Sequence, residues 1–312
     1  MKANRGASDG IYRIVRAALF FALVASTAAL GVRQVWADNI PLGNAVNYVV
    51  LYEGTGGHNL SVSNVTVNGR VGVGGTGAVQ FSGPGTINGE LDFAAASTGQ
   101  YHNTNSMNHG PTTVTYGNGN VSSALSTVNA LSSSLAGLGN NLALNGTQTI
   151  SESAGELEDI NGVDYYVFDV TSYSENNGNV VTIKGNGSGD PVVLDFGFNS
   201  NVNLGGDVTL TGLSDDQVLW NFTSSGKNIS LNNNASSYPL PDAFMGDILA
   251  PNDALSLVNA NLDGRVFGGD SSDLQIVSGD VVTGPPVPEP STLLLLGTGL
   301  VAVGRFCKRK RV

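Results

Sequence analysis

A short pattern recurs along this chain and restricts the possible folds more than any other feature. The full pattern is an apolar residue, a polar residue, Gly-Arg-Val and then a glycine pair. It occurs at 67–75 (VNGRVGVGG) and at 262–269 (LDGRVFGG). Shorter echoes at 87–91 (INGEL) and 245–248 (MGDI) place the shared glycines 20 and 18 residues apart. Such a recurrence is typical of stacked β-architectures, because a single rung cannot bury its apolar face alone. We therefore predict one β-solenoid domain over residues 38–283.

The rest of this body reads mainly as short strands separated by glycine-containing turns. The run 46–52 is apolar at most positions, which suits a strand buried on both faces. Further strands are predicted from β-rich runs bounded by Asn-Gly, Gly-Gly and similar turns. They lie within 59–93 and at 163–173, 179–184, 191–198, 207–210, 218–222, 228–231 and 273–282. Residues 101–120 have no consistent period and are predicted to form a loop.

One stretch, residues 121–138, has the period of an amphipathic helix. Its apolar residues step by three or four positions: Val121, Leu125, Val128, Leu131, Leu135 and Leu138. We predict that Ser122 or Ser123 caps its start and that Gly137 or Gly139 ends it. Its intrinsic propensity is weak, so the helix should lie against the β-body. A membrane-surface helix is disfavoured because the polar face has no Lys or Arg.

The charge of the body excludes one class of partner. Residues 38–290 contain four basic residues and 24 of the 25 acidic ones, a net charge of −20. Such a body repels phosphate backbones, so we expect no nucleic-acid binding. A soluble secreted surface is favoured over diffuse binding of divalent cations. The single cysteine, Cys307, excludes an intrachain disulfide and any CxxC motif.

The N-terminus resembles a secretory signal peptide over residues 1–37. Four basic residues precede an uncharged apolar run at 17–31, and Val35-Trp-Ala37 supplies the small residues that a signal peptidase accepts. We predict cleavage between Ala37 and Asp38. An uncleaved membrane anchor is the alternative, although 15 residues are short for a membrane span.

The composition changes again at the C-terminus, over residues 284–312. A proline-rich linker (GPPVPEP, 284–290) precedes an apolar segment at 291–306. Sixteen helical residues extend about 24 Å, against about 30 Å for a hydrocarbon core, so we predict a short membrane helix. Its basic stop is Lys308, Arg309, Lys310 and Arg311.

This tail resembles a PEP-CTERM sorting signal. The matching parts are Pro288, Glu289 and Pro290, followed by the apolar segment and the basic end. The resemblance implies export, recognition by an exosortase-type processing enzyme and transient anchoring in the membrane. It also implies a cell-envelope or extracellular-matrix location, in a host that exports exopolysaccharide.

The body resembles the choice-of-anchor A family. The matching segments are 64–75 (NVTVNGRVGVGG), 218–222 (VLWNF), 246–252 (GDILAPN) and 261–266 (NLDGRV). That family contains adhesive or matrix proteins with interchangeable surface anchors. A more distant likeness connects the body to ice-binding β-solenoids. It implies a mainly β fold, an irregular right-handed β-helix with one long α-helix packed alongside.

Three groups of residues are candidates for a metal or catalytic site. Asn259 to Asp270 partly fits a calcium loop, but the first ligand position is Asn and no helical pattern flanks it. We interpret its central part, Asp263-Gly-Arg-Val266, as a turn between rungs, because the same pattern recurs at 67–75. The histidines, His58, His102 and His109, lack metal-ligand spacing. Asp215-Asp216 is the best candidate for polysaccharide cleavage, but adjacent residues need not converge. We predict no catalytic, cofactor or metal site.

Ice binding, which needs a flat face of regularly spaced threonines, is the main functional alternative. Thr66, Thr86, Thr209 and Thr211 are scattered along the sequence. We therefore expect a non-enzymatic surface or matrix adhesin linked to extracellular polysaccharide. Ice binding on the same scaffold is the second reading, and an enzyme that acts on polysaccharide is a distant third.

Overall fold

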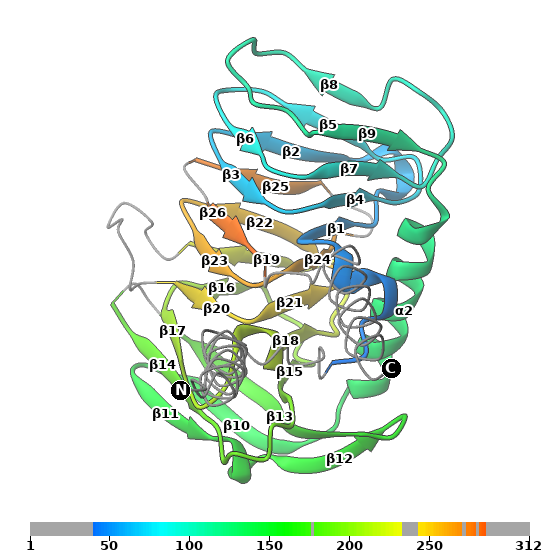
Figure 1. Cartoon of the computed structure of the whole chain (residues 1–312). Helices are drawn as coiled ribbons and strands as arrows, with labels where there is room; N and C mark the ends of the chain where they lie inside the picture. Colours follow the sequence, from blue (N-terminus) through cyan, green and yellow to red (C-terminus); the bar gives the residue numbers. More distant parts are fainter. Residues whose placement is uncertain (1–39, 176–177, 233–242, 270–272, 279–280, 285–312) are drawn as a thin grey trace, which may run out of the picture. The chain divides into compact units, whose positions relative to one another are not determined.

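The chain winds into stacked rungs, and a complete rung places one short strand on each of three faces (Figure 1). The computed structural model describes residues 40–175, 178–232, 243–269, 273–278 and 281–284. These residues all belong to one compact unit at 38–287. Both apolar clusters of the described part lie within 40–282, so this unit carries its own core.

Face A is the largest sheet and has parallel strands apart from one antiparallel edge strand, β12. Its spatial order is β10 (Asn140–Asn145), β13 (Val163–Ser174), β15 (Val192–Phe196), β18 (Val218–Phe222), β21 (Asp247–Ala250), β24 (Val266–Gly268), β1 (Val50–Tyr52), β4 (Val71–Val73), β7 (Glu90–Phe93) and β9 (Thr113–Tyr116), with β12 (Glu156–Ile160) beside β13.

Faces B and C are also parallel. Face B has the order β16 (Val202–Leu204), β19 (Asn228–Leu231), β22 (Ala254–Val258), β25 (Leu274–Val277), β2 (Asn59–Ser63), β5 (Ala78–Phe81) and β8 (Tyr101–Asn103). Face C consists of two sheets. One is β11 (Gln148–Ser151), β14 (Val180–Lys184) and β17 (Asp207–Thr211); the other is β20 (Phe244–Met245), β23 (Asn261–Asp263), β26 (Val281–Thr283), β3 (Thr66–Asn68) and β6 (Thr86–Ile87).

The rungs are not stacked in sequence order. The chain starts in the middle of the stack, climbs from β1 to β9, and returns along the side as helix α2 (Gly119–Leu135). From β10 the chain winds through a second series of rungs towards the middle of the stack, where the last rung along the chain pairs with the first. Val50 consequently pairs with Val266 on one side and with Val71 on the other. The two copies of the recurrent pattern therefore lie in neighbouring parts of the stack.

The recurrent pattern marks two corners of the solenoid. Its single glycine is the turn from face C to face A, where Gly264 has φ +156° and Gly69 has φ +152°. A Cβ on Gly264 would overlap the carbonyl oxygen of the glycine one rung away, Gly246. The following glycine pair, as in Gly74-Gly75, begins the turn from face A to face B. The interpretation of Asp-Gly-Arg-Val as a turn between rungs is confirmed.

The third corner, from face B to face C, is formed by stacked residues in the left-handed region. Asn259, Ser278, Asn64 and Gly83 have φ values of +55°, +73°, +57° and +58°. Asn259 donates its N–H to the carbonyl of Val277, and Ser278 donates to that of Ser63. Asparagine tolerates this conformation better than most residues, which accounts for two of the four positions.

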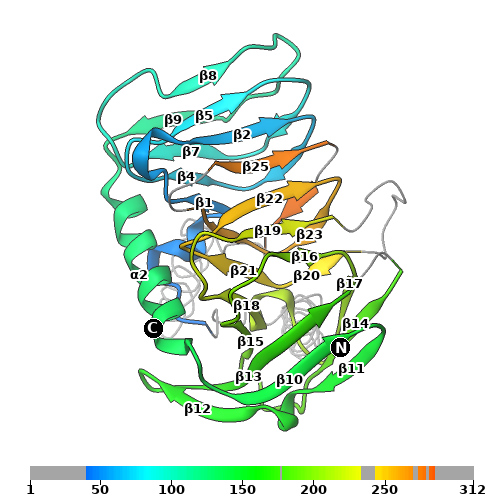
Figure 2. The same ribbon diagram turned by 180° about the vertical axis from the view of Figure 1, so that it is seen from behind.

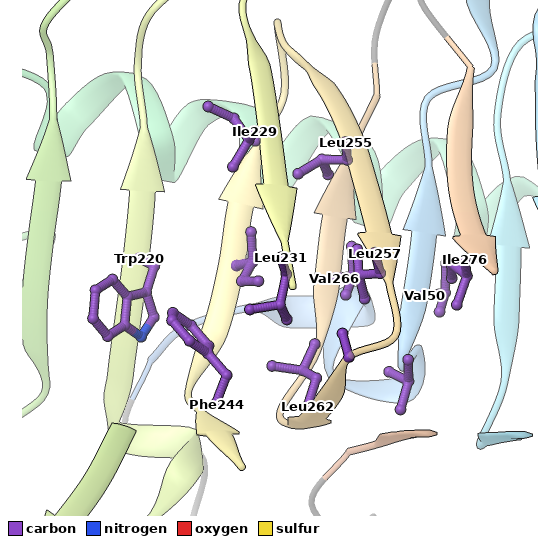
Figure 3. Packing of buried hydrophobic residues seen from close by; sticks show 14 of the residues in the cluster. Val50, Trp220, Ile229, Leu231, Phe244, Leu255, Leu257, Leu262, Val266 and Ile276 are labelled. Carbon is purple, nitrogen blue, oxygen red and sulfur yellow. The ribbon is translucent and has the colours of Figure 1, made fainter. Parts of the chain in front are cut away.

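The space between the three faces is filled by inward-pointing apolar side chains (Figure 3). Trp220 on face A is fully buried, and its ring centroid lies 4.6 Å from that of Phe244 on face C. Face B contributes alternate residues, such as Ile229 and Leu231. This alternation leaves the residues between them pointing outward.

A second apolar cluster lies outside face A and is covered by α2. The helix buries Val121, Val128 and Leu135, among others, against outward residues of face A such as Leu219 and Phe267. The segment at 40–48, which includes the short helix η1 (Gly43–Asn47), joins the same cluster. The predicted mainly β solenoid with one helix packed alongside is confirmed.

Four local predictions need correction. The strand predicted over 46–52 is β1 at Val50–Tyr52 only, because η1 extends to Asn47. The helix is Gly119–Leu135 rather than 121–138, and the side chain of Asn118, not Ser122 or Ser123, caps it by accepting from the Asn120 N–H. Residues 101–120, predicted as a loop, contain β8 and β9, because neighbouring strands supply pairing that a local period cannot show. The predicted strand 273–282 is two strands, β25 and β26, divided by the corner at Ser278.

Candidate functional site

Two of the three faces are not covered by any element that the structure describes. Face A is covered by α2 and η1. The outward side chains of faces B and C are instead exposed or half-buried at most positions. A surface that binds a partner should therefore be sought on these two faces.

Face B carries a continuous column of polar side chains across all seven strands. The register aligns Asn203, Ser230, Ser256, Gln275, Ser61, Gln80 and His102. The strands that carry the column can be followed in Figure 2 from β16 to β8. Neighbouring strands are about 4.8 Å apart, so hydroxyl and amide groups repeat at that interval along the stack. The Ser230 hydroxyl donates to Asn203 Oδ1 at 3.1 Å, which holds two adjacent members of the column in place.

Face B is also free of formal charge. None of its seven strands contains Asp, Glu, Lys or Arg, although the body has a net charge of −20. The outward positions beside the column are small at Ala78 and Ala254, and apolar at Val258 and Val277. The face is therefore a regular surface of uncharged side chains, which costs less to desolvate than a charged surface. We call it the uncharged polar face.

Face C brings together threonines that are far apart in the sequence. Thr149, Thr182 and Thr209 pair in register on β11, β14 and β17, and the last two hydroxyl oxygens are 3.0 Å apart. Thr66 and Thr86 also pair. The expectation that the threonines are scattered is therefore wrong at these positions, because the rungs align residues about 30 positions apart. Face C differs from face B in carrying charged outward residues, such as Lys184 and Asp207.

The arginine of the recurrent pattern binds acidic residues of neighbouring rungs. Arg265 Nη1 lies 2.9 Å from Asp247 Oδ2, and its backbone N–H donates to Asp247 Oδ1 at 2.8 Å. Both side chains are buried. The other copy, Arg70, forms a half-exposed ion pair with Glu90, and its Nε lies 3.6 Å from Oδ2 of the buried Asp92. From the sequence, the arginine was interpreted only as part of a turn. The acidic residue that follows the shared glycine of the neighbouring rung, Asp247 or Glu90, is the signal that could have predicted these ion pairs.

Asp215-Asp216 lies in a short 3-10 turn, η4 (Asp215–Gln217), at the corner before β18. Burial, with smaller effects from the carboxylates of Asp263 and Asp216, raises the pKa of Asp215 to about 6. The fold thus brings Asp215 within electrostatic range of Asp263, which adjacency in sequence did not predict. Within the described ranges, no group of three or more His, Cys, Asp or Glu side chains is arranged to hold a metal ion.

The remaining predicted residues can be placed or lie outside the described part. His102 and His109 are exposed, and His58 Nδ1 lies 3.6 Å from Asp273 Oδ1. Asp270 of the calcium-loop interpretation lies outside the described residues. So do Ala37, Asp38, Pro288, Glu289, Pro290 and Lys308, Arg309, Lys310, Arg311. Among the helices that the structure describes, none combines the length and apolarity that a membrane crossing requires.

A buried polar network joins α2 to face A. Asp195 accepts from the Gly137 N–H at 2.8 Å and from Asn221 Nδ2 at 2.7 Å. The hydroxyl of Ser132, on α2, donates to Asn221 Oδ1 at 2.7 Å. Burial raises the pKa of Asp195 from its ordinary value of 3.8 to about 6, and the two hydrogen bonds only partly oppose this effect.

The raised pKa of Asp195 predicts how stability depends on pH. Between about pH 4 and pH 6 the folded chain binds this proton more tightly than the unfolded chain. Protonation of Asp195 therefore stabilises the folded chain. This contribution to the free energy of unfolding is complete below about pH 4 and is lost as the pH rises through 6. Lowering the pH from 7 to 4.5 should stabilise the wild type by about 2 kcal/mol more than Asp195→Asn. Thermal denaturation of both proteins at the two pH values measures this, and equal changes would contradict it.

Comparison with known families assigns both parts of the chain. Residues 38–276 match a family model described as "Putative Ice-binding-like adhesive domain". Residues 286–311 match the PEP-CTERM protein-sorting motif. No curated protein sequence matches the chain. The sorting motif indicates export to the cell envelope or the extracellular space.

Several solved structures share the fold. An ice-binding protein from the Antarctic ascomycete Antarctomyces psychrotrophicus is 12% identical, with a TM-score of 0.50 over 79% of this chain and 98% of its own. One from an Antarctic biological consortium is 16% identical, with a TM-score of 0.51 over 79% and 91%. One from an Arctic yeast is 17% identical, with a TM-score of 0.50 over 81% and 98%. At these identities the likeness extends to the fold alone.

Proposed function

The chain belongs to the ice-binding-like adhesive domain family, and on that basis we propose that it is an exported, non-enzymatic surface protein that adheres to extracellular polysaccharide. The observation that carries this proposal is the uncharged polar face. It is uncovered by the described elements, regular over seven strands, and free of formal charge in a body whose net charge is −20.

A polysaccharide suits this face because both surfaces are polar, extended and repetitive. Hydroxyl and amide groups such as Ser256 and Gln275 can exchange hydrogen bonds with sugar hydroxyls along the stack. Each bond contributes about 1 kcal/mol net, so strength has to come from many simultaneous contacts. The serines of the column lose less conformational entropy when they are immobilised than longer side chains such as glutamine do. The column therefore favours weak, multivalent adhesion to a polymer over tight binding of one small molecule.

Retention on polymer tests this function. Residues 38–284, purified, should be retained on the host's own exopolysaccharide without shortening the polymer. The same protein is applied in parallel to growing ice. Thermal hysteresis without retention would replace adhesion by ice binding. Retention with falling polymer length would indicate an enzyme, with Asp215 as the first residue to substitute.

Ice binding is the second candidate, and one observation of this chain supports it. Thr149, Thr182 and Thr209 form a column on three adjacent strands, and several proteins of the same fold are described as ice-binding. The column is short and lies beside charged residues such as Lys184. Loss of thermal hysteresis in Thr149→Glu/Thr182→Glu, with retention on polymer intact, would assign the two functions to separate faces.

We also propose how the protein reaches the surface. A signal peptide is cut between Ala37 and Asp38, the segment at 291–306 holds the chain briefly in the membrane, and Lys308 to Arg311 stop its transfer. An exosortase-type enzyme then cuts near Pro288-Glu289-Pro290. Mass spectrometry of surface-extracted protein should find a C-terminus near Pro290. Peptides that contain Arg311 in that fraction would count against this route.

A further inference from the structure

The two ends of the solenoid differ from the rest of its surface in two ways. The top end is the outermost rung on one side of the stack, formed by β8, β9 and their connection at 104–112 (Figures 1 and 2). The bottom end is formed by β10, β11 and β12. Each end leaves strands paired on one side only: β9 with β7, β8 with β5, β10 with β13 and β11 with β14. Such edges present backbone N–H and C=O groups to a further strand.

The exposed large apolar side chains of the described residues also lie at these ends. Met107 is 66% exposed in the connection of the top end, and Leu157 is 53% exposed on β12 at the bottom end. The inner apolar column is itself half-exposed where it reaches the top, at Val114 and Tyr116. Each end therefore combines unpaired backbone with apolar surface that water solvates poorly.

Charge decides which ends can meet. No Asp, Glu, Lys or Arg occurs between Phe93 and Ser151, so the top end and strands β10 and β11 carry no formal charge. Edge strand β12 carries Glu156, Glu158 and Asp159. Two bottom ends would bring these carboxylates together, whereas a top end offers them no like charge. A top end docked on a bottom end therefore brings no like formal charges together, although the body has a net charge of −20.

Strand direction favours the same arrangement. Every strand of face A from β9 to β10 runs parallel to its neighbours along that path. A second copy, shifted along the stack, would place its β10 beside β9 in the parallel direction that the rest of the sheet uses. A two-fold pair of like ends would instead need antiparallel pairing. When two copies join through unlike ends, one top end and one bottom end remain free, so further copies can be added in the same way.

We propose that copies of this chain assemble end to end, with the top end of one copy docked on the bottom end of the next. Met107 and Leu157 lie in the two contact surfaces, and β9 extends the sheet of the next copy through β10. The columns of neighbouring copies then lie on the same side of the assembly, separated by the two lowest rungs, which have no strand on face B. This proposal does not depend on what that face binds.

Variants in which one end carries an added charge test this assembly. For residues 38–284, light scattering should show an average mass that rises with concentration without levelling off at a dimer. Met107→Glu blocks the top by placing a carboxylate against β12, and Leu157→Glu blocks the bottom by burying a charge. Each variant alone should remain monomeric. An equal mixture should form dimers and nothing larger, because one free end remains on each.

The matched control is Ser133→Glu, which adds the same charge on the exposed side of α2 and should assemble as the wild type does. Met107 and Leu157 are exposed, so both variants should melt at the wild-type temperature. A wild type that stays monomeric throughout would overturn the proposal. Dimers of either blocked variant alone would also overturn it, because they would show that like ends meet.

Discussion

Replacing Gly264 by alanine should abolish the native fold at ambient temperature or destabilise it by at least about 3 kcal/mol. The new Cβ would overlap the carbonyl oxygen of Gly246 and lie 2.6 Å from its carbonyl carbon. Relief requires that the two rungs separate, which breaks the ladder between β21 and β24. The backbone adds a second cost, since φ is +156° at this position, outside the range of alanine. Chemical denaturation followed by circular dichroism measures the loss.

Gly119→Ala is the matched control. It adds the same methyl group at the first residue of α2, where nothing lies within 4 Å of the new Cβ. Alanine favours the helix, so stability should stay unchanged or rise by up to about 1 kcal/mol. A Gly264→Ala protein as stable as the control would show that the rungs do not stack at this corner.

Breaking the buried ion pair should have the second-largest effect. Arg265→Met leaves the fully buried Asp247 without its charged partner, which should cost about 3–5 kcal/mol at pH 7. Burial already raises the pKa of Asp247 against the opposing effect of Arg265, and the substitution removes that opposition. The variant should therefore recover stability as the pH falls and Asp247 takes up a proton. Chemical denaturation at pH 7 and at pH 4.5 compares the stability of the variant with Asp247 mainly ionised and with Asp247 more often protonated.

Two further variants test whether the unpaired buried charge of Asp247 causes the loss of stability. Asp247→Asn/Arg265→Met should recover at least half of the loss, because the amide oxygen of the new side chain still accepts from the backbone N–H of residue 265 and no charge is left unpaired. Arg70→Met removes the arginine of the other copy of the pattern, which pairs with the half-exposed Glu90 and with the buried Asp92. It should cost less than Arg265→Met, because Arg70 itself is partly exposed and Asp92 keeps the Tyr48 hydroxyl as a donor. Equal losses in Arg265→Met and Arg70→Met would contradict the assigned role of burial.

The sequence predicted the parts of the fold that local physics determines. The corner glycines were recognisable because few other residues tolerate both the positive φ and the close approach of the next rung at Gly69 and Gly264. The helix was recognisable because its apolar period differs from that of a strand. Its cap was misplaced by a few residues because several polar residues in this region can cap a helix.

The parts that depend on the stacking of distant rungs could not be predicted. The column Thr149, Thr182 and Thr209 joins residues 33 and 27 positions apart, and the spacing differs because the intervening turns differ in length. The pairing of β1 with β24 depends on the return of the chain along α2, which no local pattern indicates. The uncharged polar face could be recognised only after register had aligned residues as distant as Ser61 and Gln275.

The most direct test of the proposed function compares two faces of the same body. Ser61→Glu/Ser256→Glu places two protruding carboxylates in the column of the uncharged polar face. Thr149→Glu/Thr182→Glu adds the same charge to face C. Retention on the host's exopolysaccharide should fall at least about tenfold in the first variant, a change of about 1.4 kcal/mol, and should not change in the second. Undiminished retention of the first variant, with loss in the second, would show that adhesion does not take place on this face.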